Sequence, residues 1–281
     1  MAAHDDVLYE SDERIAIITL NRPTTLNALT PAAEYALRRA VGTALVDSAV
    51  RVILITGAGR GFCSGTDVNS MPEVQPHDWP PPSWRWPGQK LRGAESVGPE
   101  LSTCYDGPFG YLLATPKPII AAINGPAAGL GLVLSLYADL RFASASASFC
   151  TAFAKRGLVA EHGISWLLPR LVGPANALDL LLSARRIDAL EALRMGLVNR
   201  VFAADTFIDD VRAYARGMVD TVSPRSVAVM KAQVWRALVQ DFNDALHVTD
   251  IEIGKSLASA DFKEGVAHFL EKRAPRFPDE Y

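Results

Sequence analysis

The chain has 281 residues, of which 49% are hydrophobic and 21% are charged, and its formal net charge is −3. This composition is typical of a globular protein with a large buried core, and it excludes a disordered or fibrous chain. The slightly acidic balance argues against a basic surface that would bind nucleic acid or an anionic membrane.

The cysteines and the N-terminus point to the compartment. Cys63, Cys104 and Cys150 lie far apart, and no C-x-x-C or H-E-x-x-H spacing occurs, which argues against a disulfide framework and a zinc site. Residues 1–14 lack the features of a secretory signal or a transit peptide. The most apolar stretch, residues 127–138, is shorter than the ~20 residues needed to cross a bilayer. We therefore expect a cytoplasmic protein that binds no membrane.

The N-terminal part alternates between strand and helix patterns. Residues 14–20 and 50–56 are apolar runs that predict strands. Between them the sequence predicts a helix over residues 31–47, with Thr30 as its N-cap and Pro31 at its first position. This order of strand, helix and strand is typical of an α/β fold.

A second unit of the same kind follows. It comprises a predicted strand over 117–124, a helix over 129–138 and a short strand over 139–144. From about residue 205 only helical spacing of apolar residues remains. We therefore predict an α/β core over residues 1–204 and a helical C-terminal region over residues 205–281.

Residues 72–110 form a long irregular loop in this interpretation. The segment holds eight of the 18 prolines and three of the five tryptophans, Trp79, Trp84 and Trp86. Its composition fits a lid or a pocket wall as well as it fits a disordered excursion.

The glycine-rich segment 55–68 follows a predicted strand, as a dinucleotide-binding or phosphate-binding loop would. Its spacing fits neither, because Phe62 stands where G-x-G-x-x-G needs its last glycine and no Gly-Lys-Ser/Thr occurs. Ser64 also lacks the flanking glycines of a G-x-S-x-G nucleophile elbow.

Several longer motifs, in order along essentially the whole chain, closely resemble the crotonase superfamily, the enoyl-CoA hydratase and isomerase family. The matching stretches are LNRPTTLNAL (20–29), VRVILITGAGRGFCSGTDVNSM (50–71), KPIIAAINGPAAGLGLVLSLYADLRFAS (117–144), LLPRLVG (167–173), SARRIDALEALRMGLVNRV (183–201) and FLEKRAPRF (269–277). The resemblance implies a spiral of β-β-α units with a helical C-terminal trimerisation region, assembled as a homotrimer or hexamer. It also implies an acyl-CoA thioester substrate, and we expect no metal or redox cofactor.

The resemblance implies chemistry through a thioester enolate whose oxygen is held by two backbone N–H groups, those of Thr66 and Leu130. Gly129 and Gly131 would let a ligand approach the backbone, and Leu130 lies in the first helical turn, where N–H groups lack intrahelical partners. Without the other motifs, the glycines would indicate only close helix packing.

The acid–base residue departs from the two-carboxylate pattern of the hydratases. The positions of the two hydratase glutamates fall on Val133 and Phe153, which cannot exchange protons. Glu161 matches the single catalytic glutamate of peroxisomal-type Δ3,Δ2-enoyl-CoA isomerases, where dienoyl-CoA isomerases carry an aspartate. The apolar residues 157–160 predict a setting that raises its pKa. The alternative is an exposed glutamate at the start of a helix near residues 163–170.

The remaining candidates carry less weight. His162 follows Glu161 directly, and adjacent side chains in regular structure point in different directions. Asp67 fits a structural role in its loop better than a catalytic one. The resemblance suggests that coenzyme A contacts Leu26, Ala28, Ser64, Asp67, Val68 and Gly129, with Lys272 or Arg273 near its phosphates. A second carboxylate could come from the loop residues Asp78, Glu95, Glu100 or Asp106.

These observations favour an enzyme that shifts a Δ3 double bond to Δ2 through a thioester enolate, with Glu161 as its single base. One alternative is an enoyl-CoA hydratase that adds water to a 2-enoyl-CoA. The other is a non-catalytic homologue that binds RNA or coenzyme A. The lack of a basic stretch argues against RNA, and the acidic residue at position 161 argues against a dead site.

Overall fold

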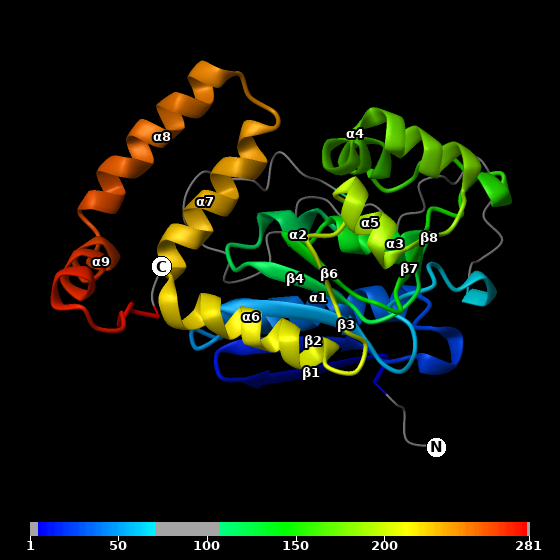
Figure 1. Ribbon diagram of the computed structural model, residues 1–281, viewed down its shortest axis with the longest axis horizontal. Helices are drawn as coiled ribbons and strands as arrows, with labels where there is room; N and C mark the ends of the chain where they lie inside the picture. Colours follow the sequence, from blue (N-terminus) through cyan, green and yellow to red (C-terminus); the bar gives the residue numbers. More distant parts are fainter. Residues whose placement is uncertain (1–4, 71–106, 280–281) are drawn as a thin grey trace.

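The computed structural model describes residues 5–70 and 107–279, and its centre is a mixed β-sheet (Figure 1). The strand order is β1-β2-β3-β4-β6-β9; β1 is antiparallel to β2, and each later neighbour is parallel. The strands are β1 (Val7–Asp12), β2 (Ile15–Leu20), β3 (Val52–Gly57), β4 (Ile119–Ile123), β6 (Leu140–Ser144) and β9 (Arg200–Phe202).

Parallel strands buried on both faces read as continuous apolar runs, which is why β2, β3 and β4 stand out in the sequence. Their side chains alternate between two hydrophobic clusters. On β3, Ile53 and Ile55 belong to the larger cluster, and Val52 and Leu54 to the smaller one on the opposite face. The sheet therefore separates two layers of core.

The helices cover these two faces. Helix α1 (Pro31–Val46) packs on the larger cluster, and its N-cap Thr30 accepts a hydrogen bond from the amide of Ala33, as the sequence predicts. Helix α6 (Phe207–Thr221) covers the other face through Phe207, Val211 and further residues at helical spacing.

A smaller sheet and further helices lie beside the main sheet. The small sheet has the order β5-β7-β8, with β5 (Ala127–Ala128), β7 (Ser148–Cys150) and β8 (Ile187–Asp188). The other elements before the C-terminal region are the helices α2 (Gly110–Ala114), α3 (Leu130–Leu136), α4 (Ile164–Ser183) and α5 (Ala189–Met195), and the 3-10 turns η1 (Pro23–Thr25), η2 (Val68–Ser70) and η5 (Ala154–Arg156). Helix α4 is kinked where Gly173 has a non-helical backbone, directly before Pro174.

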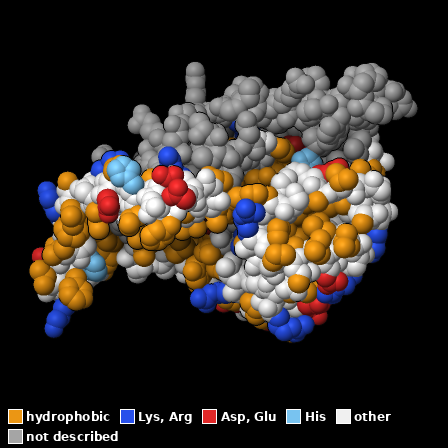
Figure 2. Space-filling model, turned by 90° about the horizontal axis from the view of Figure 1, so that it is seen from above, with side chains coloured by type: hydrophobic (Ala, Val, Ile, Leu, Met, Phe, Trp, Pro, Cys, Tyr) orange, Lys and Arg blue, Asp and Glu red, His pale blue; other side chains and the backbone are white. Residues whose placement is uncertain are grey.

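The last three helices are α7 (Pro224–Ala237), α8 (Phe242–Leu257) and α9 (Ala260–Glu271). Figure 1 shows α8 and α9 projecting away from the sheet, and Figure 2 shows hydrophobic side chains along this projecting part. Midway along α7, Lys231 Nζ lies 2.7 Å from a carboxylate oxygen of Asp139. The chain after α9 returns to the sheet, where Arg51 Nη2 donates to the carbonyl of Phe277.

The predicted fold class is confirmed, since the strands and helices predicted for the core lie within two residues of the observed ones. Strand β1, the small sheet and the length of α4 were not foreseen. The helices follow one another from residue 207, but the division at residues 204 and 205 stays a prediction. Trp79, Trp84 and Trp86 lie outside the described residues. None of the helices formed by residues 5–70 and 107–279 has the length and apolarity that crossing a membrane requires.

Candidate active site

The proposed oxyanion segment runs beside the chain that leads into α1. Leu29 forms an isolated parallel bridge with Thr66. The amide of Leu29 donates to the carbonyl of Gly65 over 2.7 Å, and the amide of Asp67 donates to the carbonyl of Leu29 over 2.8 Å. These bonds use the groups on either side of Thr66, so its own N–H faces away from Leu29.

The second predicted donor lies on the neighbouring segment. Leu130 is the first residue of α3, so its N–H has no acceptor within the helix. An added Cβ on Gly65 would lie 3.4 Å from the nitrogen of Leu130, which places the two segments in contact. Within residues 5–70 and 107–279, the N–H groups of Thr66 and Leu130 donate to no backbone carbonyl.

Glycine is required where these segments touch. Gly65 has a φ of 106° and Gly129 a φ of 51°, conformations that side chains rarely adopt. A Cβ on Gly131 would lie 2.2 Å from the carbonyl oxygen of Cys63. Close packing therefore explains the glycines at 65 and 131, and the approach of a ligand to the backbone here stays a prediction.

The two positions of the hydratase glutamates are core positions. Val133 is fully buried and Phe153 nearly so, and both belong to the larger hydrophobic cluster. Neither side chain carries a group that could activate water.

Glu161 lies in the turn between η5 and α4, and its side chain is 21% exposed. Its carbonyl accepts a hydrogen bond from the amide of Ile164 over 3.0 Å. Burial raises the pKa of the Glu161 carboxyl, which is the predicted direction. The predicted cause, burial of the carboxyl, is the one found, although Leu158 is 45% and Val159 75% exposed.

The side chains of His162 and Glu161 approach each other, although adjacent side chains in a regular helix or strand point in different directions. His162 has a φ of 52°, and its Nε2 lies 3.7 Å from Oε2 of Glu161. The His162 side chain is 7% exposed, and burial lowers its pKa to about 4. The imidazole is therefore neutral at pH 7 and gives the neighbouring carboxylate no full positive charge.

A hydrogen bond from the residue that follows α3 holds the turn that carries Glu161. The hydroxyl of Tyr137, the residue that follows α3, donates to the carbonyl of His162 over 2.9 Å. Leu130 and Tyr137 are seven residues apart, about 10 Å along a helix that rises ~1.5 Å per residue. A single short helix thus connects one proposed oxyanion donor with the turn of the proposed base.

Asp67 has the structural role that its position suggests. Arg22 Nη2 donates to Oδ2 of Asp67 over 2.8 Å, and Arg22 Nη1 donates to the carbonyl of Ala28 over 2.6 Å. This hydrogen bond from Arg22 lowers the pKa of the Asp67 carboxyl. The side-chain amide of Asn27 donates to the carbonyls of Ala58 and Gly61.

Arg22 and Asn27 were missed as positioning residues, although both lie in the LNRPTTLNAL motif quoted for the family resemblance. Only the pairing of this segment with residues 58–67 shows what they hold.

Most of the predicted coenzyme A residues lie together, on the paired segments 26–29 and 64–68. The amide of Ser64 donates to the carbonyl of Leu26 over 2.9 Å, and Val68 is 63% exposed beside them. Lys272 ends α9 on the projecting part of the chain, away from α3 (Figure 1). Arg273 is held by Glu264. The structure therefore does not bring Lys272 or Arg273 to the other candidates within one chain.

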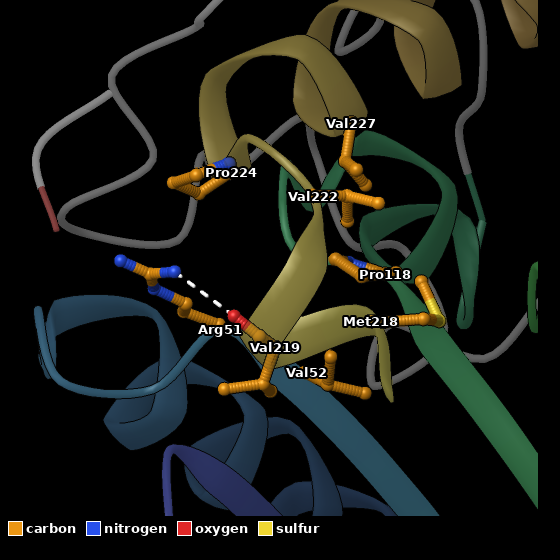
Figure 3. Close-up of a pocket in the computed structure, with 8 residues that line it drawn as sticks. All are labelled: Arg51, Val52, Pro118, Met218, Val219, Val222, Pro224 and Val227. Carbon is orange, nitrogen blue, oxygen red and sulfur yellow. Dashed lines mark hydrogen bonds between the residues drawn. The ribbon is translucent and has the colours of Figure 1, made fainter. Parts of the chain in front are cut away.

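An apolar cavity elsewhere is unrelated to this site (Figure 3). It lies on the α6 side of the sheet, and its lining residues are Arg51, Val52, Pro118, Met218, Val219, Val222, Pro224 and Val227. Arg51 turns outward there to donate to the carbonyl of Val219, so the cavity offers no acid–base group.

Two further points concern metal ligands and the loop carboxylates. Within the described ranges, no group of three His, Cys, Asp or Glu side chains could hold a metal ion. The four loop carboxylates proposed as a second acid lie outside the described residues: Asp78, Glu95, Glu100 and Asp106.

Comparison with protein families agrees with this geometry, because the family model described as enoyl-CoA hydratase/isomerase matches residues 10–79 and 99–280. The chain belongs to the enoyl-CoA hydratase/isomerase family. The resemblance read from the sequence is therefore confirmed, and with it the prediction of an enzyme.

Relatives within the enoyl-CoA hydratase/isomerase family cover nearly the whole chain. A probable enoyl-CoA hydratase of Mycobacterium bovis is 38% identical over 95% of this chain and 90% of its own length. The 1,2-epoxyphenylacetyl-CoA isomerase of Escherichia coli is 32% identical over 96% of this chain and 97% of its own. A solved enoyl-CoA hydratase subunit of Geobacillus kaustophilus superposes with a TM-score of 0.84 at 29% identity, covering 98% of each chain.

Proposed function

We propose that this protein is a Δ3,Δ2-enoyl-CoA isomerase in which Glu161 is the single acid–base residue. One observation carries the proposal. The partly buried carboxyl of Glu161 lies in the turn that is bonded to the end of α3, whereas both positions of the hydratase glutamates hold hydrophobic residues of the core. A double-bond shift needs one proton carrier that acts twice, whereas the usual hydration needs two carboxylates.

The reaction follows from these groups. The Glu161 carboxylate removes a proton from C2 of a 3-enoyl thioester. The electron pair of that C–H bond forms a double bond between C1 and C2, and the π pair of the carbonyl moves to the thioester oxygen. The N–H groups of Thr66 and Leu130 stabilise the resulting dienolate, each by about 3–4 kcal/mol by analogy with other oxyanion holes. The Glu161 carboxyl then returns the same proton to C4, which leaves the double bond between C2 and C3 and restores the carbonyl.

The raised pKa of Glu161 suits a group that takes up and releases a proton in turn. The neutral neighbour His162 supports this role, because a protonated imidazole at 3.7 Å would lower the pKa of the carboxyl. The Escherichia coli relative named as an isomerase of a CoA thioester also favours an isomerisation.

Enoyl-CoA hydration is the second candidate, and the names of several relatives favour it. It would require Glu161 to act on water, together with one of the carboxylates of Asp78, Glu95, Glu100 or Asp106.

Two incubations separate the candidates. The pure protein is given a 3-enoyl-CoA and, separately, a 2-enoyl-CoA in ¹⁸O-labelled water. Isomerisation predicts that the 3-enoyl-CoA becomes 2-enoyl-CoA without incorporation of label. Incorporation of ¹⁸O without migration of the double bond would refute the isomerase. In either reaction, Glu161→Gln should lower turnover by at least about 100-fold.

The C-terminal helices support a homotrimer or hexamer as the working form. Their exposed apolar side chains form a band on the projecting part of the chain (Figure 2). Those most exposed are Met230, Val234, Phe242, Phe269 and Leu270. A monomer rarely exposes so much contiguous apolar surface. Light scattering coupled to size exclusion should give three or six times the mass of 30.3 kDa.

We also propose that the reaction needs no metal or redox cofactor, because proton transfer and two amide donors account for every step. Turnover should therefore be unchanged after treatment with a chelator. We propose the cytoplasm as the compartment of the reaction.

A further inference from the structure

The side chain of Arg22 joins the two backbone segments that meet at Thr66. Its Nη1 donates to the carbonyl of Ala28 over 2.6 Å, and its Nη2 donates to Oδ2 of Asp67 over 2.8 Å. Ala28 directly precedes Leu29. Asp67 directly follows Thr66, which forms the isolated bridge with Leu29. One guanidinium therefore bonds both segments, in each case one residue from the bridged pair.

The direction of the Thr66 N–H depends on this pairing of segments. The peptide unit that joins Gly65 to Thr66 holds both the Gly65 carbonyl and the Thr66 N–H, and in a planar trans unit the two point in opposite directions. The Gly65 carbonyl accepts a hydrogen bond from the amide of Leu29 over 2.7 Å. The Thr66 N–H therefore stays aimed away from Leu29 only while segments 26–29 and 64–68 remain paired.

Arg22 is itself held on both sides of its guanidinium. Its backbone amide donates to Oδ1 of Asn27 over 2.9 Å, and its carbonyl accepts from the amide of Asn27 over 2.9 Å. Its Nε lies 3.7 Å from a carboxylate oxygen of Asp6. The guanidinium thus faces two carboxylates, those of Asp6 and Asp67, and presents no uncompensated charge to a substrate.

The chemistry of Arg22 suits a group that holds two backbone segments together. A guanidinium is planar and donates several hydrogen bonds in fixed directions, whereas an ammonium is a point charge on a flexible chain. Hydrogen bonds between charged groups are about twice as strong as neutral ones. The side chains of Arg22 and Asp67 are 23% and 9% exposed, so water screens this pair only in part.

We propose that Arg22 is a positioning residue that keeps the Thr66 N–H aimed at the thioester oxygen, acting through Ala28 and Asp67. This inference rests on the proposed function, in which Thr66 stabilises the dienolate. Misplacing such a group by ~1 Å can cost about 100-fold in rate. Because the oxyanion develops in the transition state, Arg22→Met should lower kcat at least about tenfold and change KM less than about threefold.

The deciding test observes the donors without turnover. Hexanoyl-CoA labelled with ¹³C at the thioester carbonyl has no double bond to shift, and its carbonyl stretch is recorded by infrared difference spectroscopy on the full-length protein. Hydrogen bonds to the carbonyl oxygen weaken the C=O bond and lower this frequency. We expect a lower frequency on the unaltered protein than in water, and a return most of the way to the water value in Arg22→Met.

Two further variants assign the effect. Arg22→Lys keeps the charge but not the planar group, so its carbonyl frequency should be displaced as in Arg22→Met, and it replaces that variant should the methionine protein not fold. Arg185→Met is the matched control, because Arg185 donates to carboxylates of Asp179 and Glu191, each over 2.7 Å, between α4 and α5. Its carbonyl frequency and kcat should be unchanged. Circular dichroism verifies the fold of each variant.

Three outcomes overturn the inference. They are an unaltered carbonyl frequency in the Arg22 variants, a frequency that Arg22→Lys restores in full, which would assign the effect to charge alone, and an equal displacement in Arg185→Met. If the expected displacements occur but the isomerase assay fails, only the proposed reaction is refuted. A frequency on the unaltered protein equal to that in water would refute the oxyanion site, and with it both proposals.

Discussion

The hydroxyl of Tyr137 donates a hydrogen bond to the main-chain carbonyl of His162 over 2.9 Å, joining the end of α3 to the turn that carries Glu161. The same turn is confined by Gly163, because a Cβ there would lie 2.8 Å from the Tyr137 hydroxyl. One side chain thus fixes where the proposed base stands relative to the helix that supplies an oxyanion donor.

Tyr137→Phe should therefore lower kcat more than it alters KM. The substitution keeps the ring that packs edge-on against Phe109 but removes the bond to the turn, and we expect kcat to fall about tenfold. The free energy of unfolding should fall by about 1 kcal/mol. Steady-state kinetics with a 3-enoyl-CoA and urea unfolding measure the two effects.

Tyr9→Phe is the control for this prediction. The buried hydroxyl of Tyr9 has no partner among the described residues, so its removal should leave kcat within error and should not lower the free energy of unfolding. Equal kinetic losses in the two variants would show that the bond to His162 has no special role.

The pH profile of kcat/KM should report the carboxyl of Glu161. The reaction needs the ionised base, and burial raises its pKa above the ordinary value of 4.5. Activity should therefore fall as the pH decreases, with a midpoint higher than that of an exposed glutamate. The residual activity of Glu161→Gln should lack this acidic limb; a limb that persists in the variant would assign it to another group.

Gly65→Ala should separate the two proposed oxyanion donors. The new Cβ would lie 3.0 Å from the carbonyl oxygen of Ala128 and 3.4 Å from the nitrogen of Leu130, so the segments must move apart. We expect kcat to fall by about 100-fold, the effect of losing one such donor.

Gly107→Ala is the matched control, since Gly107 has nearly the same φ, 104° against 106°, and no atom of the described residues lies within 4 Å of an added Cβ. It shares the backbone strain but not the contact, so its kcat should stay close to that of the unaltered protein. A comparable loss of kcat in both variants would count against the oxyanion assignment.

The buried pair of Lys231 and Asp139 should make an asymmetric contribution to stability. Asp139→Asn leaves the Lys231 ammonium buried without a countercharge and should lower the free energy of unfolding by about 3–5 kcal/mol. Lys231→Met should cost less, because the Asp139 carboxylate keeps its bonds from the amide of Ile119 and the indole N–H of Trp235. Urea unfolding ranks the two variants, and the reverse order would contradict this account.

The sequence by itself determined the core of the fold. Strands β2, β3 and β4 are apolar on both faces because both faces are covered, and such runs need no knowledge of their neighbours to be recognised. The N-cap of α1 at Thr30 is a local interaction and was equally readable. Strand β1 is as long as β2, but its sequence VLYESD has only Val7 buried and so shows no apolar run. The two- and three-residue strands of the small sheet are too short to show a period, so only pairing with other segments creates them.

For the candidate site, too, some features could be predicted from the sequence and others depend on the tertiary structure. The sequence determined that Val133 and Phe153 carry no carboxylate, because residue identity suffices for that. Only the tertiary structure decided the setting of Glu161: a left-handed turn brings His162 to 3.7 Å, and the hydroxyl of Tyr137 bonds this turn from the end of α3. The contact of Arg22 with Asp67 joins positions 45 residues apart. Packing between distant segments fixes such distances, and no local pattern in the chain encodes them.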